Sequence, residues 1–193
     1  KADEYRRMPW RNGLGETAQL AIGPAGATLD DFEWRVSMAR IDADGPFSIF
    51  PDTDRTLTVL RGDGLYLSVD GRASVELTRD SEPLAFRGDI AAIAKLLGAP
   101  VADLNVMTRH GKLQHSMRRI PLPGDVTLAV NASVALLVCA EGPLVVTANA
   151  RSARLESLDT LLLEQPPTEL RVSGNEFAVA YLIEIEQCQR AAK

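Results

Sequence analysis

Apolar and polar residues alternate in short runs along most of the chain, and helical periodicity is nearly absent. The segment FEWRVSMARI (32–41) is typical of these runs. Its odd-numbered residues, including Arg35 and Ser37, lie on one face of an extended chain, and its even-numbered residues lie on the other. Because Gly, Pro and Asp separate such runs, the pattern predicts a series of short antiparallel β-strands.

Local signals refine this prediction at three places. Asp70-Gly71 separates two alternating runs, which predicts a hairpin because both residues of such a turn need a positive φ. The segment KLLG (95–98) has the composition of a single helical turn. The polar segment 110–125 contains proline and is predicted to be a connector.

The second half of the chain repeats the order of the first. The two halves align with Gly62 over Gly142 and with Asp89 over Asp159, and each ends in a long apolar run. Two such units predict a duplicated β-sandwich or barrel. The spacing alone leaves a duplicated jelly roll and another kind of sandwich open. We expect one domain with halves at residues 1–115, which include an N-terminal arm, and 116–193.

Composition and charge exclude several classes of function. The chain carries 21 basic and 26 acidic residues, a net charge of −5, with no long run of like charge. We therefore expect neither a nucleic-acid partner nor an anionic membrane surface. No apolar stretch approaches the roughly 20 residues that span a bilayer, and no signal peptide is recognisable. Cys139 and Cys188 are expected to be buried, reduced thiols of a cytoplasmic protein.

The run VLRGDGLYLSVDG followed by FRGD resembles the strand-turn pattern of cupins. In metal-binding cupins, two histidines and a glutamate before the glycine bind the metal. Counting back from Gly62 places Arg55 at the glutamate position. The histidine positions are occupied by Ile49 and Pro51, or by Ser48 and Phe50. The resemblance implies a cupin that has lost its metal ligands, so we expect no bound metal and no cofactor.

Several motifs in the same order resemble the HutD/Ves family of bicupins. These are MPWRNGLGET, WRVSMARIDADGPFSIFPDTDRTLTVLRGDGL, EPLAFRGD and DLNVMTRHG. The resemblance covers residues 5–115 well and the second half in outline. The family arm usually reads M-P-W-K-N-G-G-G, whereas this chain has Arg11 for the lysine and Leu14 for one glycine. The family fold implied is all-β, with two antiparallel jelly-roll (double-stranded β-helix) halves.

The resemblance also implies a function. The family is linked to bacterial histidine utilisation, and its members are thought to bind a small carboxylate such as urocanate or formylglutamate. We therefore expect a small-molecule binding protein with a regulatory or buffering role. The alternative is a metal-independent isomerase or hydrolase acting on a similar acid. A third possibility is a protein-interaction scaffold with a vestigial pocket.

Arg55 is the leading candidate for contact with a carboxylate. A guanidinium offers two parallel donors that match a carboxylate, and the cupin register places Arg55 inside the barrel. The competing interpretation is a rim residue whose aliphatic stem packs against the sheet. Arg55 is also expected to be able to pair with Asp54 or Asp52 instead of a ligand.

Strand alternation supplies further candidates. Asn105, Met107 and Arg109 share one face of DLNVMTR, and Arg35 and Ser37 share one face of a neighbouring run. These faces are interpreted either as the wall of a ligand pocket or as a solvated sheet surface.

The glycine-rich arm MPWRNGLGET (8–17) supplies the last candidates, Trp10, Arg11, Asn12 and Thr17. One interpretation is that Trp10 plugs the end of the barrel. The other is that the arm covers the mouth of the first barrel and contacts the ligand, because glycine lets the backbone approach closely.

We assign no catalytic residue, because no His or Cys is among the pocket candidates and a general base at neutral pH is therefore lacking. Asp54 with a raised pKa would favour the enzyme. His110 and His115 as a metal pair would leave a coordination shell half empty. Exposed edge strands in cupins predict a possible homodimer.

Overall fold

The computed structural model describes residues 1–10, 13 and 15–188. In these residues the chain is all-β, with antiparallel sheets and no helix long and apolar enough to cross a membrane. The chain forms two compact units. The N-terminal unit is Tyr5–Leu113, and the C-terminal unit combines Lys1–Glu4 with Gln114–Lys193. The division therefore lies within a strand near the expected boundary, and the first four residues group with the second half.

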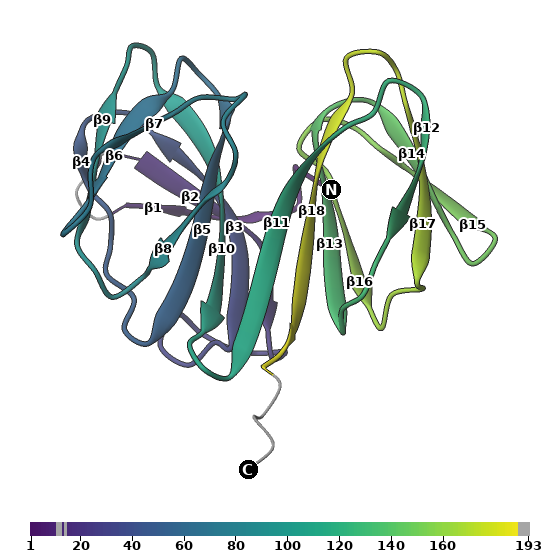
Figure 1. Ribbon diagram of the computed structural model, residues 1–193, viewed down its shortest axis with the longest axis horizontal. Coiled ribbons are helices and arrows are strands. Elements are labelled where there is room, and N and C mark those ends of the chain that lie inside the picture. The colour runs from purple at the N-terminus through teal and green to yellow at the C-terminus, as the bar shows by residue number, and fades with distance from the viewer. Residues whose placement is uncertain (11–12, 14, 189–193) are drawn as a thin grey trace. The chain divides into compact units, whose positions relative to one another are not determined.

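The N-terminal unit consists of a six-stranded and a four-stranded sheet (Figure 1). In spatial order, the larger sheet contains β1 (Arg6–Pro9), β2 (Gly15–Gly23), β3 (Trp34–Ile41), β10 (Val101–Arg109), β5 (Thr53–Arg61) and β8 (Leu84–Arg87). The smaller sheet contains β4 (Gly45–Pro46), β9 (Ala92–Leu96), β6 (Leu65–Val69) and β7 (Val75–Leu77). Apolar side chains of both sheets, such as Leu57 of β5 and Leu67 of β6, share one core cluster.

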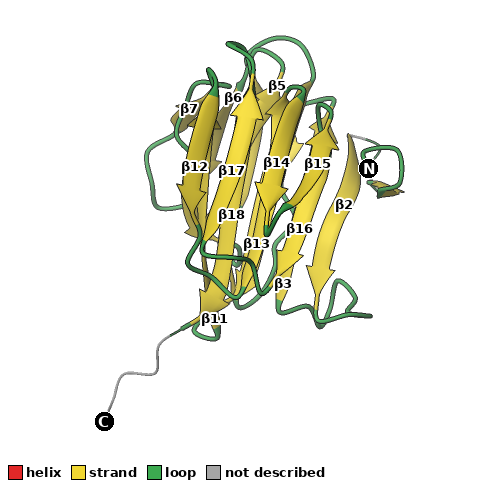
Figure 2. Cartoon of the chain, turned by 90° about the vertical axis from the view of Figure 1, so that its right-hand side faces the viewer, coloured by secondary structure: helices red, strands yellow, loops and turns green. Residues whose placement is uncertain are grey.

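The C-terminal unit consists of two four-stranded sheets, one behind the other in Figure 2. One sheet contains β11 (Leu113–Pro121), β18 (Val179–Gln187), β13 (Val134–Glu141) and β16 (Thr160–Glu164). The other contains β12 (Asp125–Ala129), β17 (Glu169–Gly174), β14 (Leu144–Ala148) and β15 (Arg151–Leu155). Its core cluster is apolar and includes Leu137, Cys139 and Leu182.

The two units share one strand order. The order β3-β10-β5-β8 corresponds to β11-β18-β13-β16, and β4-β9-β6-β7 corresponds to β12-β17-β14-β15. This duplication confirms the predicted bicupin of two antiparallel jelly-roll halves. The hairpin of β1 and β2 is an addition to the N-terminal unit, at the outer side of β3.

The strand order also corrects one part of the sequence alignment. Gly62 and Gly142 are equivalent, because they follow β5 and β13. Asp89 and Asp159 are not, because Asp89 precedes β9 whereas Asp159 precedes β16, the counterpart of β8. Aspartate is common at turns, so matching Asp89 with Asp159 in the sequence paired two turns that are not equivalent in the fold.

Two local predictions were wrong. The segment 95–98, predicted to be a helical turn, is extended at its start: Lys95 and Leu96 belong to β9, and Lys95 pairs with Tyr66 of β6. The predicted connector 110–125 contains the nine-residue strand β11. Leu113 and Met117 of this strand are buried, whereas Gln114 and Ser116 on the other face are exposed. Polar residues on the outer face of this strand produced the appearance of a loop.

The predicted hairpin at Asp70-Gly71 is confirmed, but its turn is longer than two residues. β6 ends at Val69 and β7 begins at Val75, with Leu67 paired to Val75. Gly71 has a φ of 75°, whereas Asp70 does not adopt a positive φ. In this turn, Gly71 adopts the left-handed conformation and Asp70 does not.

Leu137 and Leu162 test whether the apolar core of the C-terminal unit maintains its fold. Leu137 is fully buried in the core cluster, whereas Leu162 is 41% exposed on β16. We expect Leu137→Ala to lower the free energy of unfolding by about 2–5 kcal/mol, because it leaves a cavity. Leu162→Ala is the matched control and should cost less than about 1 kcal/mol. Urea denaturation measures both, and equal losses would contradict this account.

Candidate ligand-binding site

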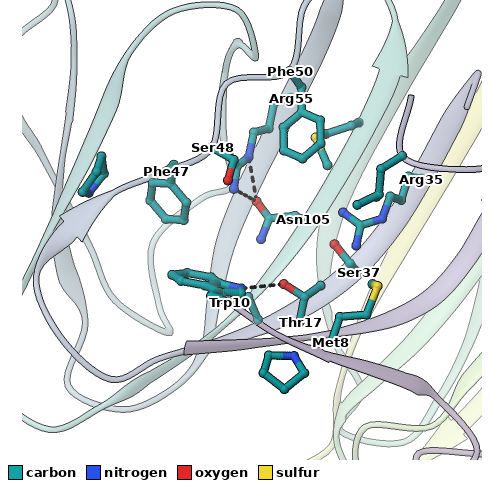
Figure 3. Close-up of a pocket in the computed structure, with 15 residues that line it drawn as sticks. Met8, Trp10, Thr17, Arg35, Ser37, Phe47, Ser48, Phe50, Arg55 and Asn105 are labelled. Atoms are coloured by element: carbon teal, nitrogen blue, oxygen red, sulfur yellow. Dashed lines mark hydrogen bonds between the residues drawn. The ribbon is translucent and has the colours of Figure 1, made fainter. Parts of the chain in front are cut away.

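A cavity of about 420 Å³ opens into the N-terminal unit. Figure 3 shows its walls, with Arg35 and Arg55 entering from different strands and Trp10 on another side. The cavity is lined by Met8, Pro9, Trp10, Thr17, Leu29, Arg35, Ser37, Ala39, Pro46, Phe47, Ser48, Phe50, Arg55, Asn105 and Met107. Its volume lies within the range of roughly 300–1,000 Å³ that small-molecule sites occupy.

The N-terminal arm forms one wall of this cavity as a β-hairpin. Met8 pairs with Thr17, and the Trp10 N–H donates to the Gly15 carbonyl at 2.9 Å. The indole Nε1 donates to Thr17 Oγ1 at 2.8 Å, which fixes the ring against the wall (Figure 3). A Cβ at Gly15 would collide with the Arg40 carbonyl and lie 3.1 Å from the indole. Glycine at this position therefore lets the indole lie close to the backbone.

The sequence suggested that the arm precedes the first strand, whereas in the structure the arm itself contributes to two paired strands, β1 and β2. Trp10 both lines the cavity and packs against the apolar core of the unit. The two interpretations of Trp10, as a plug and as a pocket wall, are therefore compatible. Arg11 and Asn12, also candidates, lie outside the described residues, as does Leu14.

Arg55 is held on β5 by neutral groups. Its side chain is buried, and Nε and Nη2 both donate to Asn105 Oδ1, at 2.8 and 2.5 Å. Its Cζ lies 4.5 Å from the centroid of the Phe47 ring and 5.4 Å from that of Phe86. Burial lowers the pKa of Arg55 to about 10, although the charge of Asp103 opposes this effect. At neutral pH Arg55 is therefore a buried cation clamped by an amide and two aromatic rings.

Arg35 is a second buried guanidinium in the same cavity. It lies on β3, opposite Met107 of β10, and burial lowers its pKa. Its Nε is 3.4 Å from Gln19 Oε1, a long hydrogen bond. In the part of the chain that the structure describes, neither Arg35 nor Arg55 forms an ion pair with a carboxylate. Two buried cations that lack a directly bonded carboxylate are energetically costly, and Asp103 acts on Arg55 only from behind Asn105, so the cavity is suited to an anion.

Asp103 lies behind Asn105 on β10, outside the lining of the cavity. Its side chain is fully buried, and Oδ1 accepts from Asn105 Nδ2 at 2.5 Å and from the Ala39 N–H at 3.1 Å. Its second oxygen, Oδ2, has no hydrogen-bond partner among the described residues. Burial raises the pKa of Asp103 to about 6 despite the nearby charge of Arg55.

Most of the described candidate residues line this one cavity. They are Trp10, Thr17, Arg35, Ser37, Arg55, Asn105 and Met107. Ser48 and Phe50 also line it, whereas Ile49 is 55% exposed, so the second of the two cupin registers faces inward.

Arg109 does not belong to this group. It lines a neighbouring cavity of about 290 Å³ and donates to the carbonyls of Pro51 and Phe32. Alternation along β10 correctly places it on the same face as Asn105, but it lies at the end of the strand, beyond the first cavity.

Asp54 does not line the cavity either. It contacts His110 Nδ1 at 2.8 Å and Arg87 at 3.8 Å on the exposed side of β5. The expected alternative of an Arg55–Asp54 pair is therefore wrong, since the described partner of Arg55 is Asn105. The described residues contain no cluster of three or more His, Cys, Asp or Glu side chains arranged to hold a metal.

The equivalent positions of the C-terminal unit are apolar. In the strand register, Arg55, Asn105 and Asp103 correspond to Ala135, Leu182 and Ala180. These three belong to the core cluster of that unit. The polar group is therefore a feature of one half of the duplicated fold.

Sequence reasoning missed Asp103 and Phe47. Strand alternation could have identified Asp103, because it lies two residues before Asn105 and therefore on the same strand face. Phe47 follows the two-residue strand β4 in an irregular segment, where no periodicity shows which way a side chain points.

The fold and the cavity define a bicupin with a basic, partly apolar cavity in its N-terminal half. A family model described as HutD matches residues 2–180. The chain belongs to the HutD family. It is 37% identical over 165 residues to an uncharacterized 21.2 kDa protein of the hutC 3′ region in Pseudomonas putida, covering 85% of each. It is 37% identical over 119 residues to protein Ves of Citrobacter koseri, covering 60% of this chain and 61% of Ves.

Solved structures agree with this assignment. HutD from Pseudomonas fluorescens SBW25, in a formate condition, superposes with a TM-score of 0.81 at 30% identity and 97% coverage of both chains. Salicylate 1,2-dioxygenase from Pseudoaminobacter salicylatoxidans is 9% identical with a TM-score of 0.58, covering 95% of this chain and 81% of that one. The second likeness shows the fold alone.

The cavity residues predict that the purified protein holds no stoichiometric transition metal. An arginine occupies the position of the cupin glutamate, and Ser48 and Phe50 occupy the positions of the histidines. Zinc, iron and manganese are held in proteins mainly by imidazole, carboxylate or thiolate ligands, and Arg55, Ser48 and Phe50 provide none of these. Elemental analysis after extensive dialysis checks this, and one zinc, iron or manganese ion per chain would refute it.

The raised pKa of Asp103 predicts a pH-dependent contribution to stability. The folded pKa of about 6 exceeds the ordinary value of 3.8, so the folded state holds the proton more tightly. Its stabilising contribution is complete below about pH 4 and is lost as pH rises through about 6. Relative to Asp103→Asn, the wild-type free energy of unfolding should therefore fall by up to about 3 kcal/mol between these limits. Urea denaturation of both proteins across this range measures the difference, which a pH-independent offset would contradict.

Proposed function

We propose that this protein binds a small carboxylate metabolite in the cavity of its N-terminal unit. The observation that carries the proposal is the pair of buried guanidinium groups, Arg35 and Arg55, without a carboxylate partner among the described residues. A ligand carboxylate would supply the missing negative charge and accept charge-assisted hydrogen bonds. Phe47, Phe50 and Trp10 would pack against the rest of a small, partly apolar acid.

The biological role proposed is that of a regulator or buffer of such an acid in bacterial histidine utilisation, acting in the cytoplasm. Family membership, a relative from the hutC 3′ region and a HutD structure in a formate condition support this context. Urocanate and formylglutamate, acids of that pathway, are the ligands to test. The homodimer expected from exposed edge strands stays a prediction.

The described residues favour binding over catalysis. The carboxyl group whose pKa lies near neutrality, Asp103, is separated from the cavity by Asn105. A general base must reach the proton that it removes, directly or through one water molecule. His110, which contacts Asp54 on the exposed side of β5, is not part of the cavity lining.

Arg55→Ala tests the proposed function. Charge-assisted hydrogen bonds contribute roughly 1.5–3 kcal/mol each, so the loss should weaken binding by about ten- to hundredfold. Arg55→Lys should recover part of the affinity, because an ammonium retains the charge without the planar fork. Isothermal titration calorimetry with urocanate and with formylglutamate measures both variants.

Arg40→Ala is the matched control, since Arg40 is an exposed arginine of the same sheet that pairs with Asp42. It should bind like the wild type. Thermal melts of each variant show whether lost affinity reflects lost folding. An Arg55→Ala protein with normal stability and normal affinity for both acids would refute a carboxylate site at Arg55.

A further inference from the structure

The carboxyl group of Asp103 is connected to the cavity through a single side chain. Asn105 donates from Nδ2 to Asp103 Oδ1 and accepts at Oδ1 from Arg55 Nε and Nη2. Figure 3 shows the last two of these bonds at the cavity wall. The resulting chain runs from a buried acid, through an amide, to the guanidinium proposed to bind the ligand.

The orientation of the Asn105 amide is determined at both ends. Turned over, its NH₂ group would face the N–H donors of Arg55, and its oxygen would face an oxygen of Asp103. Both contacts would be repulsive. Protonation of Asp103 on Oδ2 leaves this arrangement intact, because Oδ1 can still accept from Asn105 and Ala39. Asp103 can therefore change charge without breaking the hydrogen-bonded chain.

The two charge states of Asp103 differ in their effect on an anion in the cavity. Ionised Asp103 repels a ligand carboxylate and offsets part of the attraction of Arg55, whereas neutral Asp103 does neither. The unpartnered Oδ2 adds to this difference, because a buried charged oxygen without a donor costs more than a neutral hydroxyl there.

We propose that binding of a carboxylate ligand beside Arg55 is coupled to uptake of one proton by Asp103, so that the site takes up its ligand more tightly as pH falls. This inference rests on the proposed function and names how the same site is regulated. The proton comes from solvent and is bound at Oδ2, and no covalent bond of the ligand changes.

The charged groups around Asp103 are few. Arg55 of β5 is the charged group that acts on Asp103, and the charge of Arg35 on β3 acts on Arg55. Its direct neighbours across the sheet are Ala39 on β3 and Val59 on β5, both apolar. Among the described residues, the core cluster shared with β6 and β9 is apolar as well. The ligand carboxylate would therefore be the principal new charge that Asp103 experiences on binding.

The pKa of Asp103 supports the coupling. At about 6 in the ligand-free protein, it lies close enough to neutrality that a nearby anion can raise it through pH 7. Linkage requires the reciprocal effect, in which protonation of Asp103 strengthens binding by the same factor. We expect affinity to be about tenfold higher near pH 5.5 than near pH 8.5.

The experiment is calorimetric titration with N-formylglutamate in pairs of buffers with different heats of ionisation. Near pH 7 the buffer dependence should reveal uptake of about half a proton or more per ligand. The carboxyl groups of this probe stay ionised above about pH 5.5, given their ordinary pKa near 4, whereas the imidazole of urocanate would itself titrate. Formate serves as a second probe that contains the carboxylate alone.

Asp103→Asn provides the decisive comparison, because asparagine mimics the neutral acid in shape. It should abolish the proton uptake and the pH dependence, and near pH 8.5 it should bind at least as tightly as the wild type. His110→Gln is the control for the exposed histidine of the same unit and should retain the uptake. A purely structural role for Asp103 would instead weaken binding equally at every pH.

The outcomes separate the two proposals. Binding with no proton uptake by the wild type, or uptake that persists in Asp103→Asn, overturns the coupling and leaves the carboxylate site standing. The wild-type measurement needs no variant, so a failure of Asp103→Asn to fold does not obscure it. Failure to bind either probe at any pH overturns the proposed function, and the coupling with it.

Discussion

A buried guanidinium without a carboxylate partner imposes strong demands on the protein around it. Arg55 meets them with an amide oxygen that accepts two hydrogen bonds and with two aromatic rings over which its guanidinium carbon lies. Those contacts satisfy its donors in part, and the only compensation that its charge receives among the described residues comes indirectly from Asp103, with no direct ion pair. The positions of Asn105, Phe47 and Phe86 follow from that requirement, and Asp103 in turn holds Asn105. The positive charge that the cavity presents is thus a property of the sheet as much as of one side chain.

The duplicated fold shows how little of the scaffold this polar group requires. Both halves use the same strand order, and the C-terminal half replaces Arg55, Asn105 and Asp103 with apolar residues inside its core. A closed apolar core is the ordinary way to stabilise such a sandwich. The N-terminal half gives up part of this core for a cavity, and its added hairpin supplies one wall.

The fold was largely predictable because its signals are repeated along the chain. Alternating runs and the equivalent glycines Gly62 and Gly142 report strands and turns directly. Two strand segments were misjudged because short-range composition outweighed alternation. The outer face of β11 is polar and resembled a loop, and the residues KLLG at the end of β9 have the composition of a helical turn.

The site was predictable only where strands carry it. Alternation grouped Asn105 with Met107 and Arg35 with Ser37 on shared strand faces, which the structure shows to face the cavity, and the cupin register placed Arg55. Alternation does not say where a cavity ends along a strand, which is why Arg109 was grouped with the others. Nor does it say whether an acid on an inward face is solvated, so Asp103 remained unnoticed.

The hairpin that forms the cavity wall also determines which backbone groups the larger sheet exposes at its edge. With β2 paired to β3, the long and largely buried strand β3 has neighbours on both sides. The edge becomes β1, a strand of four residues that carries Arg6 and Arg7 and ends at Pro9. Short, charged, proline-terminated edges resist pairing with the strands of other molecules. The hairpin that lines the cavity therefore also replaces a long edge strand with a short, charged one, the kind of edge that disfavours intermolecular strand pairing.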